Sequence, residues 1–487
     1  MEKSKPAGAR STLGWLSWLV IWVAGMAGQL AWNIENQWFN TFVYAKIAPD
    51  PNIITWMVAL SAIVSTIATF LGGTLSDRVG KRRIFILVGY VMWGISTIVF
   101  GCTQFFEGIL AEAVLVVVFD CVMSFFGSIG NDCGFNPWTT DISDPSNRGS
   151  LGTAIAIQPV IATILGSIGF GAIIDGFSGF VVNGQQLDYF MMFLIVGILI
   201  ALIGVVSFFL IKESPTLLPH REGSFLTALK KPFNFRLLRE NRLLFYVLLI
   251  FMTFFVSFNV YFPHILNYFI YSCSAVTWLD GKLALGINTV AGAIMAVGLL
   301  LGVPLVIVSG KLLNKQKFIP VLIASVLANM LGLAILFIGG ISGAAEVSQL
   351  LFLFLGTFLL GAGYMGLYQA LMVWVKDLYP ADMRSQFEGV RMIFYICIPM
   401  FLGTLVGNFI IQYLGNPITI TYPKGDVHGY APNHWLFLVA LGLALLSFIP
   451  IYLAYRESKK NPPNYAGLGE EQQSEESLQG AGRLEDK

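Results

Sequence analysis

One acidic residue lies in the middle of a long apolar stretch. Asp120 stands between Phe119 and Cys121 in a run without any basic residue. A carboxylate in a hydrocarbon interior is costly, so we expect it to bind a proton, face water or accept hydrogen bonds. A carboxyl group that opens alternately to the two sides of a membrane could couple proton movement to transport. The alternative is a structural acid that bonds a neighbouring helix.

A second set of polar residues lies at the end of the first apolar stretch of the chain. Glu35, Asn36 and Asn40 stand there, with Trp32 and Trp38 close by. Asn36 and Asn40 are four positions apart, so a helix places them on one face. This face is a candidate solute-binding surface or outer gate. The alternative is an interfacial belt, where tryptophan and amide groups are common.

His264 is the one histidine inside an apolar stretch, where it could carry a proton or bond a hydroxyl group. The alternative is a histidine at the membrane interface. Amides and aromatic rings suit a neutral polyhydroxyl ligand, and the lack of deeply placed Lys or Arg argues against an anionic one. The other side chains that we expect to line the same cavity are Asn259, Asn267, Gln158, Tyr364, Tyr368 and Gln369.

Long apolar segments must position these groups. The chain has 487 residues, of which 56% are hydrophobic and only 12% charged, as in a membrane protein with many spans. We predict an all-α membrane protein with twelve transmembrane helices in two pseudo-symmetric six-helix bundles. The predicted spans are 13–37, 53–75, 84–102, 109–133, 150–174, 189–211, 243–270, 285–309, 318–340, 348–375, 389–413 and 435–454.

A polar segment with several prolines divides the spans into two halves. We predict an N-terminal bundle at 1–211, a cytoplasmic central loop at 212–242, a C-terminal bundle at 243–455 and a disordered cytoplasmic tail at 456–487. The net charge of +1 gives no electrostatic case for a nucleic-acid partner.

The basic residues fix the expected orientation of the spans. Of the 29 Lys and Arg residues, all but Lys46, Lys282 and Lys424 fall in segments on one side. Basic residues concentrate on the cytoplasmic side of membrane proteins. The sequence therefore predicts an integral multi-pass protein of the cell (plasma) membrane with both termini in the cytoplasm.

A basic motif joins the second and third predicted spans. It reads Gly73-Thr74-Leu75-Ser76-Asp77-Arg78-Val79-Gly80-Lys81-Arg82-Arg83. Gly73 and Gly80 would suit a tight turn, because glycine tolerates positive φ angles. A weaker copy follows span eight at 310–317, with Asn314 in place of the acid, and other pairs recur at a similar offset. The two halves therefore look like an internal duplication. The alternative for the motif alone is a solvated loop whose acid balances its bases.

The motif and the duplication resemble the signature loop and the two-half organisation of the major facilitator superfamily. The resemblance implies a rocker-switch solute transporter whose spans one, four, seven and ten line a central cavity. It also implies that Asp77 caps a helix N-terminus in the opposite half, which would latch one conformation. The residues to which the resemblance assigns this latch are Gly73, Asp77, Arg78, Gly80, Arg148 and Arg384.

A weaker resemblance links the chain to glycoside–cation symporters and related proton-coupled sugar carriers. Sodium-using members carry acidic ion ligands in span two, whereas 53–75 contains none here. The sequence therefore favours a proton-coupled symporter of a sugar or similar neutral polar compound. The alternative is a proton-driven exporter of drugs or metabolites.

Two other classes are less consistent with the sequence. An enzyme would need a nucleophile motif, a metal motif or a phosphate loop, and the four histidines stand far apart. A sensor or receptor on the same fold would bind solute without moving it. We expect no cofactor and no metal, and the expected partners are a small solute, a proton and the lipid bilayer around a monomer.

Overall fold

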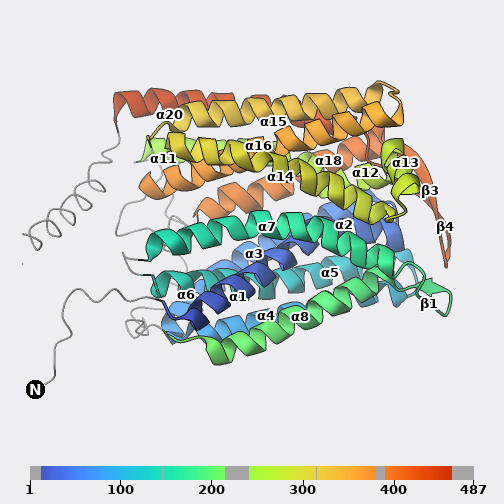
Figure 1. The fold of residues 1–487 in the computed structure, drawn as a ribbon, viewed down its shortest axis with the longest axis horizontal. Helices are drawn as coiled ribbons and strands as arrows, with labels where there is room; N and C mark the ends of the chain where they lie inside the picture. Colours follow the sequence, from blue (N-terminus) through green and yellow to red (C-terminus); the bar gives the residue numbers. More distant parts are fainter. Residues whose placement is uncertain (1–12, 144–146, 214–240, 314, 379–389, 463–487) are drawn as a thin grey trace, which may run out of the picture.

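The computed structural model describes residues 13–143, 147–213, 241–313, 315–378 and 390–462. Long helices run side by side along the molecule, with two small β-ribbons at one end (Figure 1). In the described part of the chain, twelve helices are long and apolar enough to cross a membrane. The predicted class and number of spans are therefore confirmed.

The first half contains six spans, several of which change helix type along their length. Span one extends beyond its predicted end at residue 37 and continues to Ile47. The bounds are α1 Trp15–Asn33, η1 Ile34–Trp38, α2 Phe39–Phe42 and η2 Val43–Ile47; α3 Pro51–Val79; α4 Arg82–Gly101 and η3 Cys102–Phe105; α5 Ile109–Gly127, η4 Ser128–Phe135 and α6 Asn136–Asp141; α7 Arg148–Gly176; β1 Val181–Val182 and β2 Gln185–Gln186; and α8 Asp188–Leu210.

The second half contains the other six spans. Its last helix continues to Lys460, so residues 456–460, which we expected in a disordered tail, are helical. The bounds are α11 Arg242–Tyr261, η6 Phe262–His264 and α12 Ile265–Ser272; α13 Ser274–Leu283; α14 Ile287–Leu313; α15 Phe318–Ile341; α16 Glu346–Leu378; η7 Ile393–Cys397 and α18 Ile398–Leu414; β3 Asn416–Tyr422 and β4 Gly425–Ala431; and α19 Trp435–Leu445 and α20 Phe448–Lys460.

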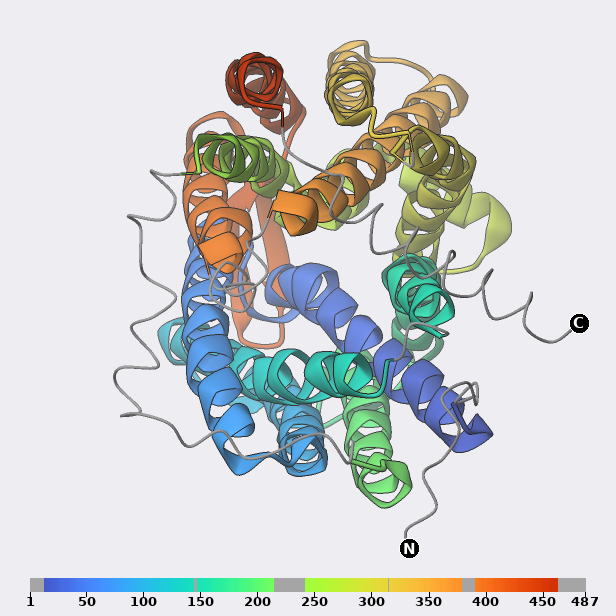
Figure 2. The ribbon, with the colours of Figure 1, turned by 90° about the vertical axis from the view of Figure 1, so that its left-hand side faces the viewer.

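The two halves meet along two pairs of helices. Figure 2, which looks along the spans, shows the first half in blue to green and the second half in yellow-green to red. Helix α7 packs against α14, and α3 packs against α18. At the first of these contacts Gly292 lies against the backbone oxygen of Ser167, and a Cβ atom at that glycine would collide with it. Small residues allow such close approach of helices in membranes.

The basic motif forms much less of a turn than predicted. Helix α3 continues to Val79 and α4 begins at Arg82, so only two residues connect them. Gly80 has a φ of 65° and its N–H group bonds the Ser76 carbonyl, as a left-handed helix end requires. Gly73 lies inside α3 with open space around it. The prediction that Gly73 forms the turn is therefore wrong. A continuous helix bonds the backbone N–H and C=O groups within the segment, so α3 extends past Gly73 although glycine is a poor helix former.

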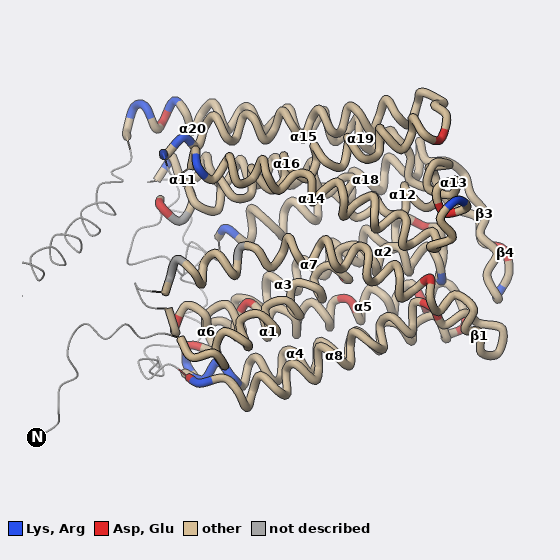
Figure 3. Tube along the Cα trace, viewed as in Figure 1, with Lys and Arg blue, Asp and Glu red and all other residues tan. Residues whose placement is uncertain are grey.

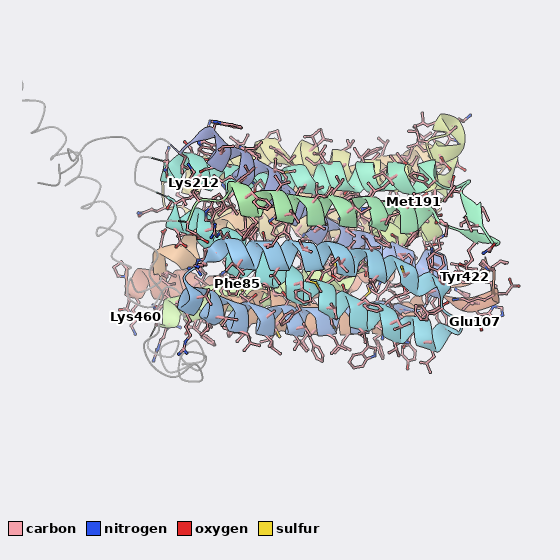
Figure 4. The ribbon with its side chains drawn as sticks, turned by 90° about the horizontal axis from the view of Figure 1, so that it is seen from below. Phe85, Glu107, Met191, Lys212, Tyr422 and Lys460 are labelled. Carbon is pink, nitrogen blue, oxygen red and sulfur yellow. The ribbon has the colours of Figure 1, made fainter. Side chains whose placement is uncertain are left out.

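Strands β3 and β4 form an antiparallel hairpin that sequence analysis missed. Ile418, Thr419, Ile420 and Thr421 alternate in the strand pattern before a Pro-Lys-Gly turn, which was the available signal. We call the end of the molecule that carries this hairpin the hairpin end, and the opposite end the basic end. Figure 4 labels Tyr422 at the hairpin end and Lys460 at the basic end, and Figure 3 shows described Lys and Arg residues gathered at the basic end.

Candidate functional site

The structure brings together the two acids that the sequence singled out separately. Asp120 lies on α5 and Glu35 in η1, with side chains that are almost fully buried. Ser124 donates a hydrogen bond to Glu35 Oε1 at 2.5 Å, and Ser61 lies within hydrogen-bonding range of Asp120. The two carboxyl groups interact electrostatically. Among the described residues, Glu35 Oε2 and Asp120 Oδ1 have no hydrogen-bond partner.

Local helix geometry explains why Asp120 and Glu35 lie together. Asp120 and Ser124 are one helical turn apart, so α5 presents both on one face. Span one changes from an α-helix to the π-helix η1 at Ile34, immediately before Glu35. Short π-helical segments often occur at functional sites, because the extra residue re-aims the side chains that follow. A hydropathy pattern does not reveal this change of helix type.

A third acid, Asp132, is half-buried and was not among the predicted site residues. It lies in η4, interacts electrostatically with Glu35, and has Ser128 and Asn131 within hydrogen-bonding range. Arg391, from the second half, also interacts electrostatically with Asp132. Glu35 of η1 therefore interacts with both Asp120 of α5 and Asp132 of η4, and links the three acids. The available signal was an acid at the end of predicted span 109–133.

Span seven is also interrupted, at the short 3₁₀ segment η6 that contains Pro263 and His264. Segments η1 and η6 pack against each other, so the irregular parts of spans one and seven meet. Asn267 Nδ2 donates to the Asn40 carbonyl at 3.0 Å across the two halves. Asn259 Nδ2 instead bonds the Phe255 carbonyl in its own helix.

The two predicted tyrosines belong to an aromatic surface of the second half. The rings of Tyr364 and Tyr368 are nearly parallel with centroids 6.0 Å apart, and Phe258 stacks on Tyr364 at 4.8 Å. Tyr395 contacts Tyr368, and the Arg391 guanidinium lies 5.7 Å from the Tyr395 ring centroid. These five side chains are partly exposed.

The remaining predicted amides make hydrogen bonds between or within helices. Gln158 is buried and its Nε2 donates to the Ile21 carbonyl at 2.8 Å, which ties α7 to α1. Gln369 Oε1 accepts from Ser309 at 3.0 Å, which ties α16 to α14. Asn36 is half-buried and bonds the Trp32 carbonyl one turn earlier. These bonds give Gln158 and Gln369 a helix-joining role in this conformation.

The motif acid Asp77 interacts within its own half. Its exposed carboxylate pairs with Arg82 at 2.8 Å, and Arg82 also pairs with Asp141 at 2.9 Å. Arg78 lies in the last turn of α3, and Arg148 begins α7. Arg384 and the segment before span eleven lie outside the described residues. The expected helix cap in the opposite half therefore stays a prediction.

An acid caps a helix of the opposite half at the hairpin end instead. Asp175, in the last turn of α7, accepts hydrogen bonds from Thr289 N at 2.6 Å, Thr289 Oγ1 at 2.7 Å and Asn288 Nδ2 at 2.7 Å. These groups form the first turn of α14. Gly286 has a φ of 95°, and a Cβ atom there would collide with Asp175. A carboxylate on exposed N–H groups at a helix start is favourable, so Asp175 holds the two halves together.

We expect Asp175→Asn to weaken closure of the hairpin end. A charge-assisted hydrogen bond contributes roughly 1.5–3 kcal/mol, so the ratio of closed to open molecules should fall about tenfold or more. Spin labels at Asn183 and Lys282, one in each half, would report this in pulsed electron paramagnetic resonance as a longer distance component. Asp426→Asn, a change at an exposed hairpin acid, is the matched control. An unchanged distance distribution would rule out the latch.

The β3–β4 hairpin extends from the second half onto the first. Tyr422 donates to the Tyr44 carbonyl at 2.5 Å, and Tyr44 donates to the Tyr430 carbonyl at 2.8 Å. Burial raises the pKa of the Tyr422 phenol, which keeps it a hydrogen-bond donor. Lys424 forms an ion pair with Glu112, which is fully buried. Hydrogen bonds between the halves thus gather at the hairpin end.

Lys424→Ala should lower the midpoint of thermal unfolding by several degrees. The change leaves the buried Glu112 carboxylate without its cation, which is strongly destabilising. The double variant Lys424→Ala with Glu112→Gln should recover most of the loss, because no unpaired charge remains. Differential scanning fluorimetry in one detergent would compare them with Lys282→Ala, an exposed lysine at the same end. A double variant no more stable than the single one would contradict this account.

Comparisons with known proteins agree with this architecture. A family model described as Major Facilitator Superfamily matches residues 15–347 and 329–481. A "Putative proline/betaine transporter" of Staphylococcus aureus is 22% identical over 422 residues, which cover 84% of this chain and 80% of the relative. The nucleoside transporter NupG superposes with a TM-score of 0.63 at 14% identity, covering 90% of this chain and 98% of that one. The inward-open xylose transporter XylE from E. coli gives 0.62 at 14% identity, covering 90% and 96%.

Proposed function

The chain belongs to the Major Facilitator Superfamily, and from this premise we propose that it is a proton-coupled symporter of a sugar or a similar neutral polar solute. As a member of this transporter family with twelve candidate spans, it is an integral multi-pass membrane protein. We propose further that it lies in the plasma membrane and acts as a monomer. The coupling ion and the solute class are the parts that experiments must test.

The observation that carries the proposal is the pair of buried carboxyl groups. Glu35 and Asp120 interact with each other and, within the described residues, neither forms an ion pair. Two like charges close together in a membrane interior repel and lack solvation. Binding one proton removes that repulsion, so the pair would bind a proton in one state and release it when water enters.

The contacts between the two halves favour a step of the transport cycle in which the outer side is closed. With the basic end in the cytoplasm, as the positive-inside rule requires, the hairpin end faces outward. The cross-half bonds of Asp175, Tyr44 and Tyr422 then close the outer side. We propose that the structure represents an inward-facing state, and that the Asp175 contacts break when the outer side opens.

A second candidate function is uptake of a small zwitterion such as proline or betaine. The Staphylococcus aureus relative carries that name. The partly exposed rings of Phe258, Tyr364 and Tyr395 also favour it, because aromatic faces attract quaternary ammonium groups. A proton-driven exporter of drugs or metabolites is the third candidate, since the same fold can serve transport in either direction.

Uptake into proteoliposomes tests these candidates together. Purified protein would be supplied with labelled pentose, hexose, nucleoside and glycine betaine, with and without an inward proton gradient. We expect one polyhydroxyl solute to accumulate only with the gradient, and a protonophore to abolish this. Accumulation of betaine alone would replace the proposal with the second candidate. If no solute accumulates under any gradient but apolar cations leave loaded vesicles, the exporter is correct.

A further inference from the structure

Unpaired polar groups concentrate where the irregular parts of spans one and seven meet. In a folded interior most buried polar atoms have a hydrogen-bond partner, so each exception needs a reason. Within the part of the chain that the structure describes, the exceptions include Gln37, Trp38 and Asn40 from span one and His264 and Asn267 from span seven. All five side chains are at least 98% buried. The contact of η1 with η6 brings the two segments together at the junction of the halves.

The hydrogen-bond network fixes which atoms of the two asparagines are unpaired. Asn40 Nδ2 donates to the Asn36 carbonyl at 2.9 Å, and Asn267 Nδ2 donates to the Asn40 carbonyl at 3.0 Å. A carbonyl oxygen can only accept, so these contacts require the NH₂ group of each amide. The unpaired atoms are therefore the acceptors Asn40 Oδ1 and Asn267 Oδ1.

Donors are also present in this region. Ser167 donates to Gln37 Oε1 at 3.2 Å, which leaves Gln37 Nε2 as an unpaired donor, and Trp38 Nε1 is another. Among the described residues, neither ring nitrogen of His264 has a partner, and a neutral imidazole offers one donor and one acceptor. The junction thus presents unpaired acceptors and unpaired donors within a few turns of two helices.

We propose that Asn40, His264 and Asn267 form a subsite that binds the hydroxyl groups of a polyhydroxyl solute before the hairpin end closes. The inference rests on the proposed transport function and names its solute class. A hydroxyl group both donates and accepts, so a polyol can pair with the asparagine oxygens and with the imidazole. After the solute leaves toward the basic end, the Asn267–Asn40 bond closes the subsite.

This chemistry separates the polyhydroxyl solute from betaine. Betaine carries a fully methylated ammonium group and a carboxylate, and so has no hydrogen-bond donor. It cannot pair with Asn40 Oδ1 or Asn267 Oδ1, which would stay buried without a partner. A site built to bond a hydroxyl group strongly rejects a ligand that lacks it. The subsite therefore favours the polyhydroxyl solute over betaine.

The test is transport kinetics of Asn40→Ala and Asn267→Ala in proteoliposomes, with the labelled pentose, hexose, nucleoside and glycine betaine as probes. Asn329→Ala is the matched control, because Asn329 is equally buried but bonds Tyr261 within the second half. We expect KM for the transported polyol to rise roughly tenfold in each subsite variant, since each loses one hydrogen bond to the solute. The control should keep the wild-type KM.

A second variant distinguishes a loss of solute binding from a folding defect. Asn267→Ser keeps an oxygen that accepts hydrogen bonds, so it should recover part of the affinity that Asn267→Ala loses. Wild-type KM for the polyol in both alanine variants would overturn the subsite while leaving the proposed function intact. Transport of betaine with a KM that depends on Asn40 and Asn267 would overturn the solute class. Absence of proton-driven uptake for every probe in the wild type would overturn the proposed function itself.

Discussion

Replacing Asp120 with Asn is expected to abolish solute accumulation driven by a proton gradient while leaving downhill exchange. The amide keeps the shape of the carboxyl group and still pairs with Ser61, but it cannot bind and release a proton. With one proton per solute and a gradient of about two pH units, coupled transport can concentrate solute roughly 100-fold. In the Asp120→Asn variant, net uptake should stop when the solute concentrations on the two sides of the membrane are equal.

The measurement compares labelled uptake under the gradient with counterflow into preloaded vesicles. Asp426→Asn is the control, because Asp426 is exposed on the hairpin and accepts a hydrogen bond from Thr421 in its own ribbon. Glu35→Gln should give the same loss, since the two carboxyl groups act as a pair. Gradient-driven accumulation that survives in both acid variants would exclude the pair as the coupling site.

Gly292→Leu is expected to reduce transport to the background of empty vesicles. The glycine lies against the backbone of Ser167 where α14 crosses α7, and no Cβ atom fits there. A backbone oxygen cannot move aside as the end of a flexible side chain can. The larger residue must therefore separate the two helices and keep the hairpin end open, which blocks alternating access.

Gly169→Leu is the matched control for this variant. Gly169 lies on the same helix as Ser167, two residues further on, with nothing within 4 Å of an added Cβ atom. Counterflow would report transport, and the spin-label pair at Asn183 and Lys282 would report separation of the halves. Full transport by the Gly292 variant would mean that the α7–α14 contact does not need to close in the cycle.

The number of spans was predictable because membrane crossing imposes a length of apolar sequence that is visible without a structure. The changes of helix type within the spans were not predictable. Glu35 and Asp132 lie in π-helical segments, where an extra residue per turn shifts the side chains away from the regular 3.6-residue pattern. Sequence spacing alone could not place Glu35 beside Asp120, because their contact depends on how span one packs on α5.

The predicted site residues differ in how their chemistry is used. Asp120 was conspicuous because a charge is rare in an apolar run, and the structure places it in the acid pair. Gln158 looked similar in type, yet its amide bonds Ile21 and joins two helices. A sequence shows that an amide is buried but not which backbone group it faces. Asp175 was overlooked because its helix-capping role depends on α14 of the other half.

The ion pair under the hairpin also has a consequence for how the protein is made. Lys424 follows Glu112 by 312 positions, so the ribosome synthesises the acid long before its partner. Until the segment between α18 and α19 emerges, Glu112 lacks the lysine with which it pairs in the complete chain. The β3–β4 hairpin therefore supplies the last partner of the first half, and we expect a chain that stops before residue 416 to lack the Glu112–Lys424 ion pair.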